Sequence, residues 1–210
     1  LMLIVVSALQ VERSYGGVVV AQLANSTAIS DKHQIFRTSK DRLYFFVVTR
    51  DTLGNYLTPY TSQDGNSWQR LASYTFSTAY TGQFGLAVDS KDIVHLVSLD
   101  DSHYPIYVPF YTADSVKGDN SWGEPEVVSQ TYSSGRAEIA FDKNDIPHIV
   151  YTTYELIDRK NRVSAINYAN KVSGLWNNKI VWPKESGSGP TVVGIDVGPD
   201  EIPVIVTDSR

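Results

Sequence analysis

The chain of 210 residues contains no cysteine and a single methionine. Without cysteine, no disulfide framework can hold the fold together. This absence does not decide the redox compartment or exclude secretion, because a closed arrangement of β-sheets is stable without disulfides. With 42% hydrophobic and 11% aromatic residues, the chain is long enough to bury a sizeable core. We therefore expect a globular fold that is stabilised by packing.

Excess positive charge is also lacking. Lysine and arginine together number 18 against 23 acidic residues, which gives a formal net charge of −5. Proteins that bind nucleic acid usually present a basic face, often with aromatic side chains within it. The sequence has no such basic and aromatic cluster, so its composition argues against a nucleic-acid partner.

Long apolar runs and helical periodicity are missing as well. The apolar opening, residues 1–6, is too short to span a bilayer, and no basic segment precedes it as in a signal peptide. We expect a strand there, and no membrane span. Elsewhere short apolar runs alternate with turn residues, which is typical of β-structure.

The sequence repeats with a period of about 54 residues. Trp68, Trp122 and Trp176 are each separated by 54 positions. A second landmark follows nearly the same interval, because three strand-like runs place an aspartate at steps of 53 and 54, namely Asp89, Asp142 and Asp196. A repeat of this length made of short strands predicts an all-β fold, a β-propeller of four-stranded antiparallel blades.

We expect a single propeller domain over residues 1–210. Whole blades are predicted near 34–76, 82–130 and 135–184, with partial blades at 1–33 and 185–210. The apolar runs 1–9 and 17–24 would supply the third and fourth strands of a composite blade, and the last residues would supply its first and second strands. This closes a four-bladed ring without exposed edges. The alternative is a fragment of a six- or seven-bladed ring. The leucine at position 1 suggests a processed product or a fragment, which bears on the number of blades.

One polar turn, SQDGNSW, carries a family resemblance. It resembles an Asp-box, the bacterial neuraminidase repeat of sialidase-like β-propellers, with its landmark residues at Ser62, Asp64, Gly65, Ser67 and Trp68. The resemblance implies a turn between the third and fourth strands of a blade. The residue types agree, because Asp64 can accept backbone N–H bonds, Gly65 can adopt a positive φ and Trp68 can pack on the sheet. We expect a structural role, not a ligand site.

Later copies of this turn are degenerate. The second is longer, and the third is shortened; the residues they keep are Asp114, Gly118, Ser121 and Trp122 in the second, and Gly174 and Trp176 in the third.

Histidines recur in the repeat. His95 and His148 occupy the same blade position, and a residue that each blade needs is more simply structural than catalytic. His33 and His103 fall in loops without a partner at metal-ligand spacing. We therefore predict no metal site and no cofactor.

The resemblance also raises sialidase chemistry, which needs an arginine cluster for a carboxylate and acidic residues for catalysis. Arg37 lies at a place comparable to the family's Arg-Ile-Pro motif, but Thr38 and Ser39 replace isoleucine and proline. Arg50 and Asp51 are the other weak catalytic candidates, and Arg136 with Glu138 opens the third blade. The match is incomplete, so we interpret these residues as charges at strand ends.

Three classes of function stay open. The loops DDSHYPIY and YTTYELIDRKNR offer aromatic side chains that suit a surface for sugar rings or protein. We favour a non-catalytic binding or platform module that recognises glycan or protein at a cell or particle surface. A sialidase-like glycoside hydrolase is one alternative, and a structural or receptor-binding component of a phage tail or extracellular assembly is the other. These functions imply an extracellular or virion-associated location; the sequence leaves the oligomeric state undetermined.

Overall fold

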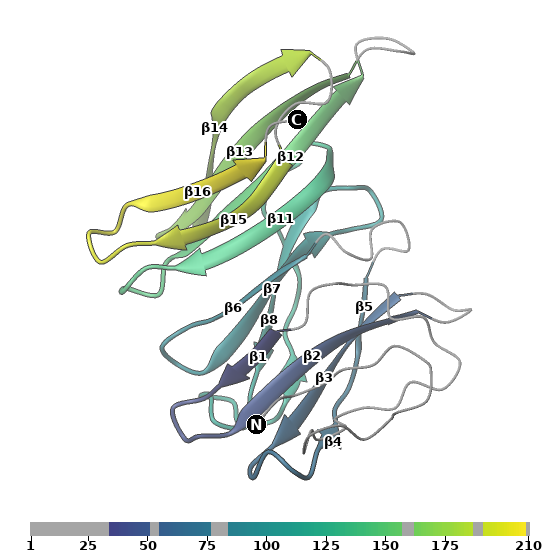
Figure 1. The fold of residues 1–210 in the computed structure, drawn as a ribbon, viewed down its shortest axis with the longest axis vertical. Helices are drawn as coiled ribbons and strands as arrows, with labels where there is room; N and C mark the ends of the chain where they lie inside the picture. Colours follow the sequence, from purple (N-terminus) through teal and green to yellow (C-terminus); the bar gives the residue numbers. More distant parts are fainter. Residues whose placement is uncertain (1–33, 51–54, 77–83, 157–161, 187–190, 209–210) are drawn as a thin grey trace. The chain divides into compact units, whose positions relative to one another are not determined.

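The structure is a computed structural model that describes residues 34–50, 55–76, 84–156, 162–186 and 191–208. Within these ranges the chain forms antiparallel β-strands and no helix (Figure 1). By internal contacts it divides into two units, Leu1–Gly82 and Gln83–Arg210.

The described part of the first unit forms one sheet, in the order β1-β2-β3-β4, with β5 also paired to β3. Its second strand forms the core, because all five side chains from Tyr44 to Val48 are buried. The strands of this sheet are β1 (Gln34–Arg37), β2 (Leu43–Arg50), β3 (Asn55–Ser62), β4 (Gln69–Arg70) and β5 (Tyr74–Phe76).

The second unit contains three sheets. Its first sheet has the order β6-β7-β8-β10, with β9 also on β8; its second has the order β11-β12-β13-β14; and its third is the pair β15-β16. The strands are β6 (Gly85–Val88), β7 (Ile93–Leu99), β8 (Pro105–Tyr111), β9 (Ser121–Trp122), β10 (Glu126–Val127), β11 (Ser133–Phe141), β12 (Pro147–Leu156), β13 (Arg162–Val172), β14 (Leu175–Ser186), β15 (Thr191–Val197) and β16 (Pro203–Asp208).

We name the four sheets S1 to S4 in chain order. In S1 to S3 the first strand pairs with the second, the second with the third, and the third with the fourth, which is in two pieces in S1 and S2. This makes a four-stranded meander, and S4 supplies the first two strands of another. A meander of this kind repeated along the sequence is the blade of a β-propeller. The predicted fold class is therefore confirmed.

Prolines in the third strands explain why the fourth strand is broken in S1 and S2. The carbonyl oxygens of Pro59 and Pro109 accept hydrogen bonds from Leu71 (2.9 Å) and Gly123 (2.7 Å). In a strand the N–H and C=O of one residue point to the same neighbour, so a proline that accepts from the fourth strand cannot also donate to it. The fourth strand therefore splits into β4 and β5, and into β9 and β10. β13 has no proline, and β14 is continuous over 12 residues.

The first and second strands of every sheet are joined by the same turn. In S2 the N–H of Asp89 donates to the Ile93 carbonyl (3.0 Å), the N–H of Asp92 donates back to Asp89 (3.3 Å), and Asp92 has a φ of 62°. The same two bonds and the positive φ recur in S1, S3 and S4, where the turns begin at Thr38, Asp142 and Gly198.

This turn corrects the aspartate landmark in the last sheet. The sequence interval matched Asp196 to Asp89 and Asp142, but Asp196 lies inside β15, where it pairs with Val204. Gly198 occupies the equivalent position, because its N–H donates to Ile202 (3.3 Å) and its carbonyl accepts from Glu201 (2.9 Å). An aspartate two residues earlier in the strand produced the nearly equal interval.

The three tryptophans of the repeat share one register position at the start of the fourth strand. Trp122 is opposite Phe110 and Trp176 is opposite Lys171. Trp68 directly precedes Gln69, which is opposite Thr61.

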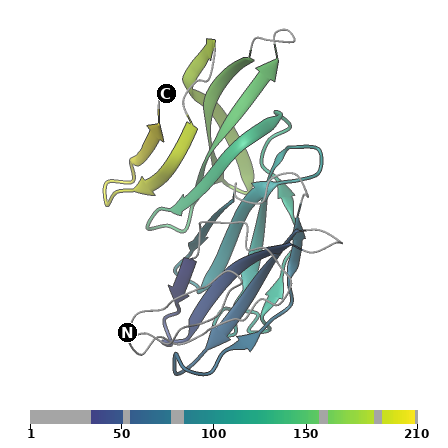
Figure 2. The same cartoon turned by 45° about the vertical axis from the view of Figure 1, so that its right-hand side comes forward.

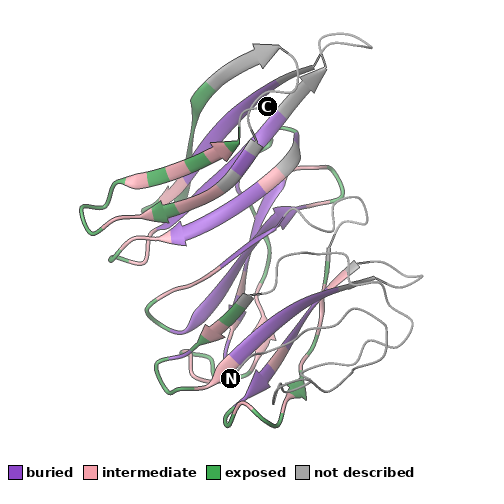
Figure 3. Ribbon diagram, in the orientation of Figure 1, coloured by how far each residue is buried: buried purple, intermediate pink, exposed green. Residues whose placement is uncertain are grey.

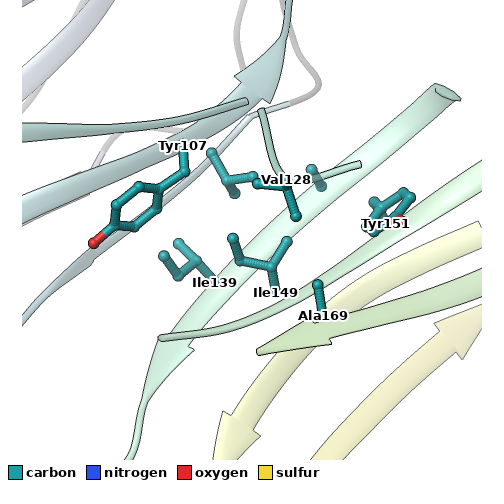
Figure 4. Close-up of a cluster of buried hydrophobic side chains, with 8 residues drawn as sticks. Tyr107, Val128, Ile139, Ile149, Tyr151 and Ala169 are labelled. Atoms are coloured by element: carbon teal, nitrogen blue, oxygen red, sulfur yellow. The ribbon is translucent and has the colours of Figure 1, made fainter. Parts of the chain in front are cut away.

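A core cluster joins S2 to S3 (Figure 4). It contains Val97 and Tyr107 from S2, Ile139 and Ile149 from S3, and the buried Val128 that follows β10. A second cluster joins S3 to S4.

Gly85 lets the first strands of S2 and S3 approach each other closely. A Cβ atom at this position would lie 2.8 Å from the Cα of Glu138 and 3.0 Å from the carbonyl oxygen of Ala137. Both are backbone atoms, so a side chain here would force β6 and β11 apart.

Several expectations fall beyond the described residues. The apolar runs 1–9 and 17–24, and with them the composite blade, lie outside the described ranges, as does His33. The single domain over 1–210 and the number of blades in a complete ring stay predictions. In the part of the chain that the structure describes, no helix is long and apolar enough to cross a membrane.

Candidate binding site

The Asp-box turn is closed by its own side chains. Asp64 Oδ1 accepts hydrogen bonds from the N–H groups of Asn66 and Ser67, both at 2.8 Å, and from the Ser62 hydroxyl at 3.1 Å. The N–H of Gly65, which has a φ of 73°, donates to Ser62 Oγ (2.9 Å). These bonds satisfy the turn within the chain, and the N–H groups of Ser67 and Asn66 hold the pKa of Asp64 below its usual value.

Trp68 attaches this turn to the sheet. Its indole N–H donates to the Gly65 carbonyl (3.2 Å), and its ring meets Phe45 edge-on with ring centroids 6.4 Å apart. With Phe45, Val47 and Tyr60 it completes a hydrophobic cluster of S1. These contacts hold the turn against the sheet, and the structural role of the Asp-box stays a prediction.

The second copy of the turn is built differently. Ser121 donates to Asp119 (2.6 Å) and not to Asp114, whose own N–H donates to the Thr112 hydroxyl (3.2 Å). Gly118 keeps a positive φ of 65°.

The third copy is a two-residue hairpin turn. Ser173 and Gly174 both have positive φ values, 54° and 81°, between the paired residues Val172 and Leu175. Two central residues with positive φ are characteristic of the type I′ turn.

His95 is the centre of a buried hydrogen-bond chain in S2. Its Nε2 lies 3.1 Å from Asp89 Oδ2, and its Nδ1 lies 2.6 Å from the Tyr107 hydroxyl. Asp89 Oδ1 accepts the N–H groups of Lys91 (3.0 Å) and Ile93 (2.9 Å). Burial raises the pKa of Asp89, but His95 and these N–H groups outweigh it and set the pKa below its usual value. Burial also raises the pKa of Tyr107, which keeps this phenol protonated.

S3 repeats this chain with one looser contact. His148 Nδ1 lies 2.5 Å from the Tyr168 hydroxyl, but its Nε2 is 3.6 Å from Asp142 Oδ2. That distance is too long for a hydrogen bond, and no described atom bonds this nitrogen. Asp142 accepts the N–H groups of Asn144 (2.8 Å) and Ile146 (2.9 Å). Both histidines thus lie in the same buried arrangement, and their structural role stays a prediction.

Of the weak catalytic candidates Arg37, Arg50 and Asp51, the structure describes the side chain of Arg37 alone. Arg37 ends β1, is 65% exposed and pairs with the exposed Asp41 at 3.1 Å. Arg50 ends β2, and the structure gives no account of its side chain. Asp51 lies outside the described residues. Arg37 is thus a charge at the end of a strand.

Arg136 and Glu138 form an ion pair on β11. Arg136 Nε lies 3.1 Å from Glu138 Oε1, and the side chains are 30% and 11% exposed. Arg136 lies within the irregularity in strand pairing between Ser133 and Ala137, and Glu138 follows it. A partly buried pair of this kind can orient a polar ligand group or simply hold the strand.

The loop between β7 and β8, within the predicted DDSHYPIY segment, has the same backbone turn as the sheet starts. The N–H of Asp100 donates to Tyr104 O (2.9 Å), and His103, at φ 66°, donates its N–H to Asp100 O (3.0 Å). Asp100 Oδ1 also accepts the N–H groups of Ser102 (2.9 Å) and Tyr104 (2.8 Å). The loop is therefore fixed by its own bonds, with the side chains of Asp101 and Ser102 exposed.

This loop holds an aromatic pair at the surface of the second unit. The ring of His103 stacks on Tyr132, with centroids 4.8 Å apart and planes 28° from parallel. The N–H of Ser133, the first residue of β11, donates to the His103 carbonyl (2.8 Å), so the partners are tied through the backbone. Tyr132 is 46% exposed. An exposed ring held in place by a stacked partner suits contact with a sugar ring or an apolar group.

Sequence reasoning identified this loop by its aromatic side chains but missed Tyr132. The spacing Asp100-x-x-His103-Tyr104, which repeats Asp89-x-x-Asp92-Ile93, is a further signal that could have predicted the same fixed turn. Tyr132 itself lies in the connection between two sheets and has no counterpart in the repeat.

The described ranges contain no group of three or more histidine, aspartate or glutamate side chains that could hold a metal ion.

No known family model and no curated protein matches the chain. Solved structures similar to it include a fucose lectin from Kordia zhangzhouensis with 14% identity and a TM-score of 0.48, covering 72% of this chain and 100% of that one. An exo-1,5-alpha-L-arabinanase from a bovine ruminal metagenomic library has 10% identity and a TM-score of 0.45, covering 91% and 85%. The intramolecular trans-sialidase from Ruminococcus gnavus has 14% identity and a TM-score of 0.42, covering 80% and 36%. At these values the likeness transfers no residue, ligand or reaction to this chain.

Proposed function

We propose that the chain is a non-catalytic binding module, which recognises a glycan through Tyr132 and the loop that carries His103. The observation that carries this proposal is the Tyr132 ring, about half exposed and stacked on His103. The exposed Asp101 and Ser102 in the same loop offer hydrogen-bond partners for sugar hydroxyls. The sialidase-like Asp-box is part of the proposal as a marker of the fold, with Asp64 as a turn residue.

The proposal includes a place at a cell or particle surface, where such a module meets glycans. The alternatives are a sialidase-like hydrolase and a component of a phage tail or extracellular assembly, and no contact in the described residues favours either one. A glycoside hydrolase of this kind needs two carboxylates that flank the scissile glycosidic bond. Arg37 pairs with Asp41 at the surface, which supports the interpretation of Arg37 as a strand-end charge.

The test is retention on a glycan array, followed by titration calorimetry with the glycan retained most strongly. Tyr132→Ala should weaken that binding about tenfold, because the stacking ring is lost. Trp182→Ala on β14 is the matched control, since it removes another partly exposed ring of the same unit. Binding that survives Tyr132→Ala but fails in Trp182→Ala would move the site to β14.

Catalysis is tested beside binding with a fluorogenic sialoside and a panel of aryl glycosides. We expect no turnover. Turnover that is lost in Arg37→Ala, with an unchanged thermal melt, would overturn the non-catalytic proposal.

A further inference from the structure

S4 presents an apolar surface that no other described residue of the second unit covers. On β16, Val204 is 59% and Val206 is 54% exposed, and Ile202 before it is 60% exposed. The burial pattern of β16 alternates along the strand, which Figure 3 shows as green and pink bands. The opposite side of this two-stranded sheet faces S3, because Ile195 and Ile205 pack against Val150 and Ile166.

Strand register identifies which element covers the equivalent surface in S2 and S3. Val206 pairs with Gly194, the position at which Val97 pairs with Gly85 and Val150 with Glu138. Val97 lies in the cluster formed with S3, and Val150 lies in the cluster formed with S4. In S2 and S3 this position is thus packed against the first strand of the following sheet. We name the surface of Ile202, Val204, Val206 and Gly194 the trailing face.

The glycines of the repeat support the same conclusion. A Cβ at Gly85 would collide with the backbone of the following sheet at 2.8 Å, whereas nothing lies within 4 Å of a Cβ at Gly194. The space that β11 fills beside Gly85 is therefore open beside Gly194.

S1 presents the complementary surface. Ile35 on β1 has the register of Ile139 and Ile195, which pack against the preceding sheet as part of the two clusters. Ile35, by contrast, is 46% exposed. We name Ile35 and the neighbouring exposed Arg37 the leading face.

We propose that the trailing face binds the leading face of a second copy of this chain. The contact is head-to-tail, so it uses two different surfaces and extends to a ring or a filament. Charge supports this partner, because residues 191–208 carry four acidic and no basic side chains. Residues 34–42 carry three basic side chains and one acidic side chain.

The turns between the first and second strands predict that the proposed contact between two copies of the unaltered chain is weak. The carboxylate of Asp145 accepts from the Ser90 N–H (2.9 Å) and hydroxyl (2.7 Å), and Lys91 Nζ is 3.2 Å away. Asp145 is three residues after the turn start Asp142, and it contacts the residues one and two positions after the turn start of the preceding sheet, Asp89. The next pair of turns repeats this contact, since Lys143 and Asn144 both lie 2.9 Å from Glu201 Oε1.

In the proposed contact, the corresponding residues are Pro199 and Asp200 on the trailing side and Asp41 on the leading side. Proline has no N–H to donate, and two carboxylates repel. Asp200→Lys should therefore restore the missing cation and strengthen the association.

Sedimentation velocity across a concentration series tests the proposal. We expect the unaltered chain to self-associate as its concentration rises, and Asp200→Lys to lower the dissociation constant about tenfold. Gly194→Val, which fills the open space, should leave a monomer, and so should Ile35→Asp on the leading face. Thermal melts of the variants control for folding, and Leu175→Ala, which alters a 72% exposed side chain on neither of the two faces, is a matched surface control.

Mixing the two monomeric variants gives the decisive experiment. Gly194→Val retains its leading face and Ile35→Asp its trailing face, so the two monomers should form a one-to-one dimer when mixed. Monomers throughout, with Asp200→Lys included, would overturn the proposal. Association that survives both Gly194→Val and Ile35→Asp would overturn it as well, because another surface would then be responsible.

Discussion

S2 and S4 use one backbone turn for two different surroundings. In S2 the turn begins with Asp89 and leads to His95. This histidine is buried, and its ring centroid lies 4.6 Å from that of Phe141 in the following sheet. In S4 the same positions hold Gly198 and Val204, and Val204 is exposed. The turn bonds form in both sheets, so the backbone and its positive φ suffice for the turn. The aspartate and histidine instead serve the buried contact, which S4 lacks.

The strongest way to break this comparison is to remove the acceptor in S2. Asp89→Ala leaves the N–H groups of Lys91 and Ile93 and the buried His95 without their carboxylate, which should lower the free energy of unfolding by about 3 kcal/mol. Asp142→Ala in S3 should cost less, because its contact with His148 is already 3.6 Å long. Denaturant melts of the two variants measure the difference, and an equal loss would contradict the distinction between them.

Low pH should destabilise the fold by protonating the same two carboxylates. The pKa of Asp89 and of Asp142 is lowered in the folded chain. Their stabilisation is therefore complete above the ordinary carboxyl pKa of 3.8 and is lost as the pH falls through the lowered folded-state values. Stability measured against pH should fall steeply on the acid side, and Asp89→Asn should make that fall shallower. If the slope of stability against pH is unchanged in Asp89→Asn, the acid sensitivity belongs to other titrating groups.

The smallest effect is expected at the Asp-box. Asp64 is exposed, so Asp64→Ala should lower the melting temperature by only a few degrees and leave glycan binding unchanged. Gln63→Ala is the control, because it removes an exposed side chain next to Asp64 and leaves the N–H groups of Asn66 and Ser67 on Asp64 Oδ1. Lost binding with an unchanged melt would make the Asp-box a ligand site.

The sequence predicted the architecture because that depends on what repeats. Trp68, Trp122 and Trp176 share one position at the start of the fourth strand, and the spacing that located them reports the period of the sheets. The same reasoning was wrong at Asp196, because an interval alone does not distinguish a strand residue from the start of a turn two positions later.

The candidate site was harder to predict because it depends on what does not repeat. Tyr132 meets His103 only once the connection into β11 folds against the loop before β8. The tyrosine partners of the two buried histidines also come from the third strand, 12 and 20 residues further along the chain. Pairings of this length follow from strand register, which a single sequence leaves undetermined.

The most direct test of the account compares Gly85→Ala with Gly194→Ala. Both glycines have the same register, but only Gly85 is pressed against a following sheet. We predict that Gly85→Ala lowers the free energy of unfolding by about 1–3 kcal/mol, because β6 and β11 must separate. Gly194→Ala should leave it unchanged or raise it by a few tenths of a kcal/mol, since alanine has less conformational freedom to lose. Equal destabilisation of both variants in denaturant melts would contradict the difference between the covered and the uncovered sheet.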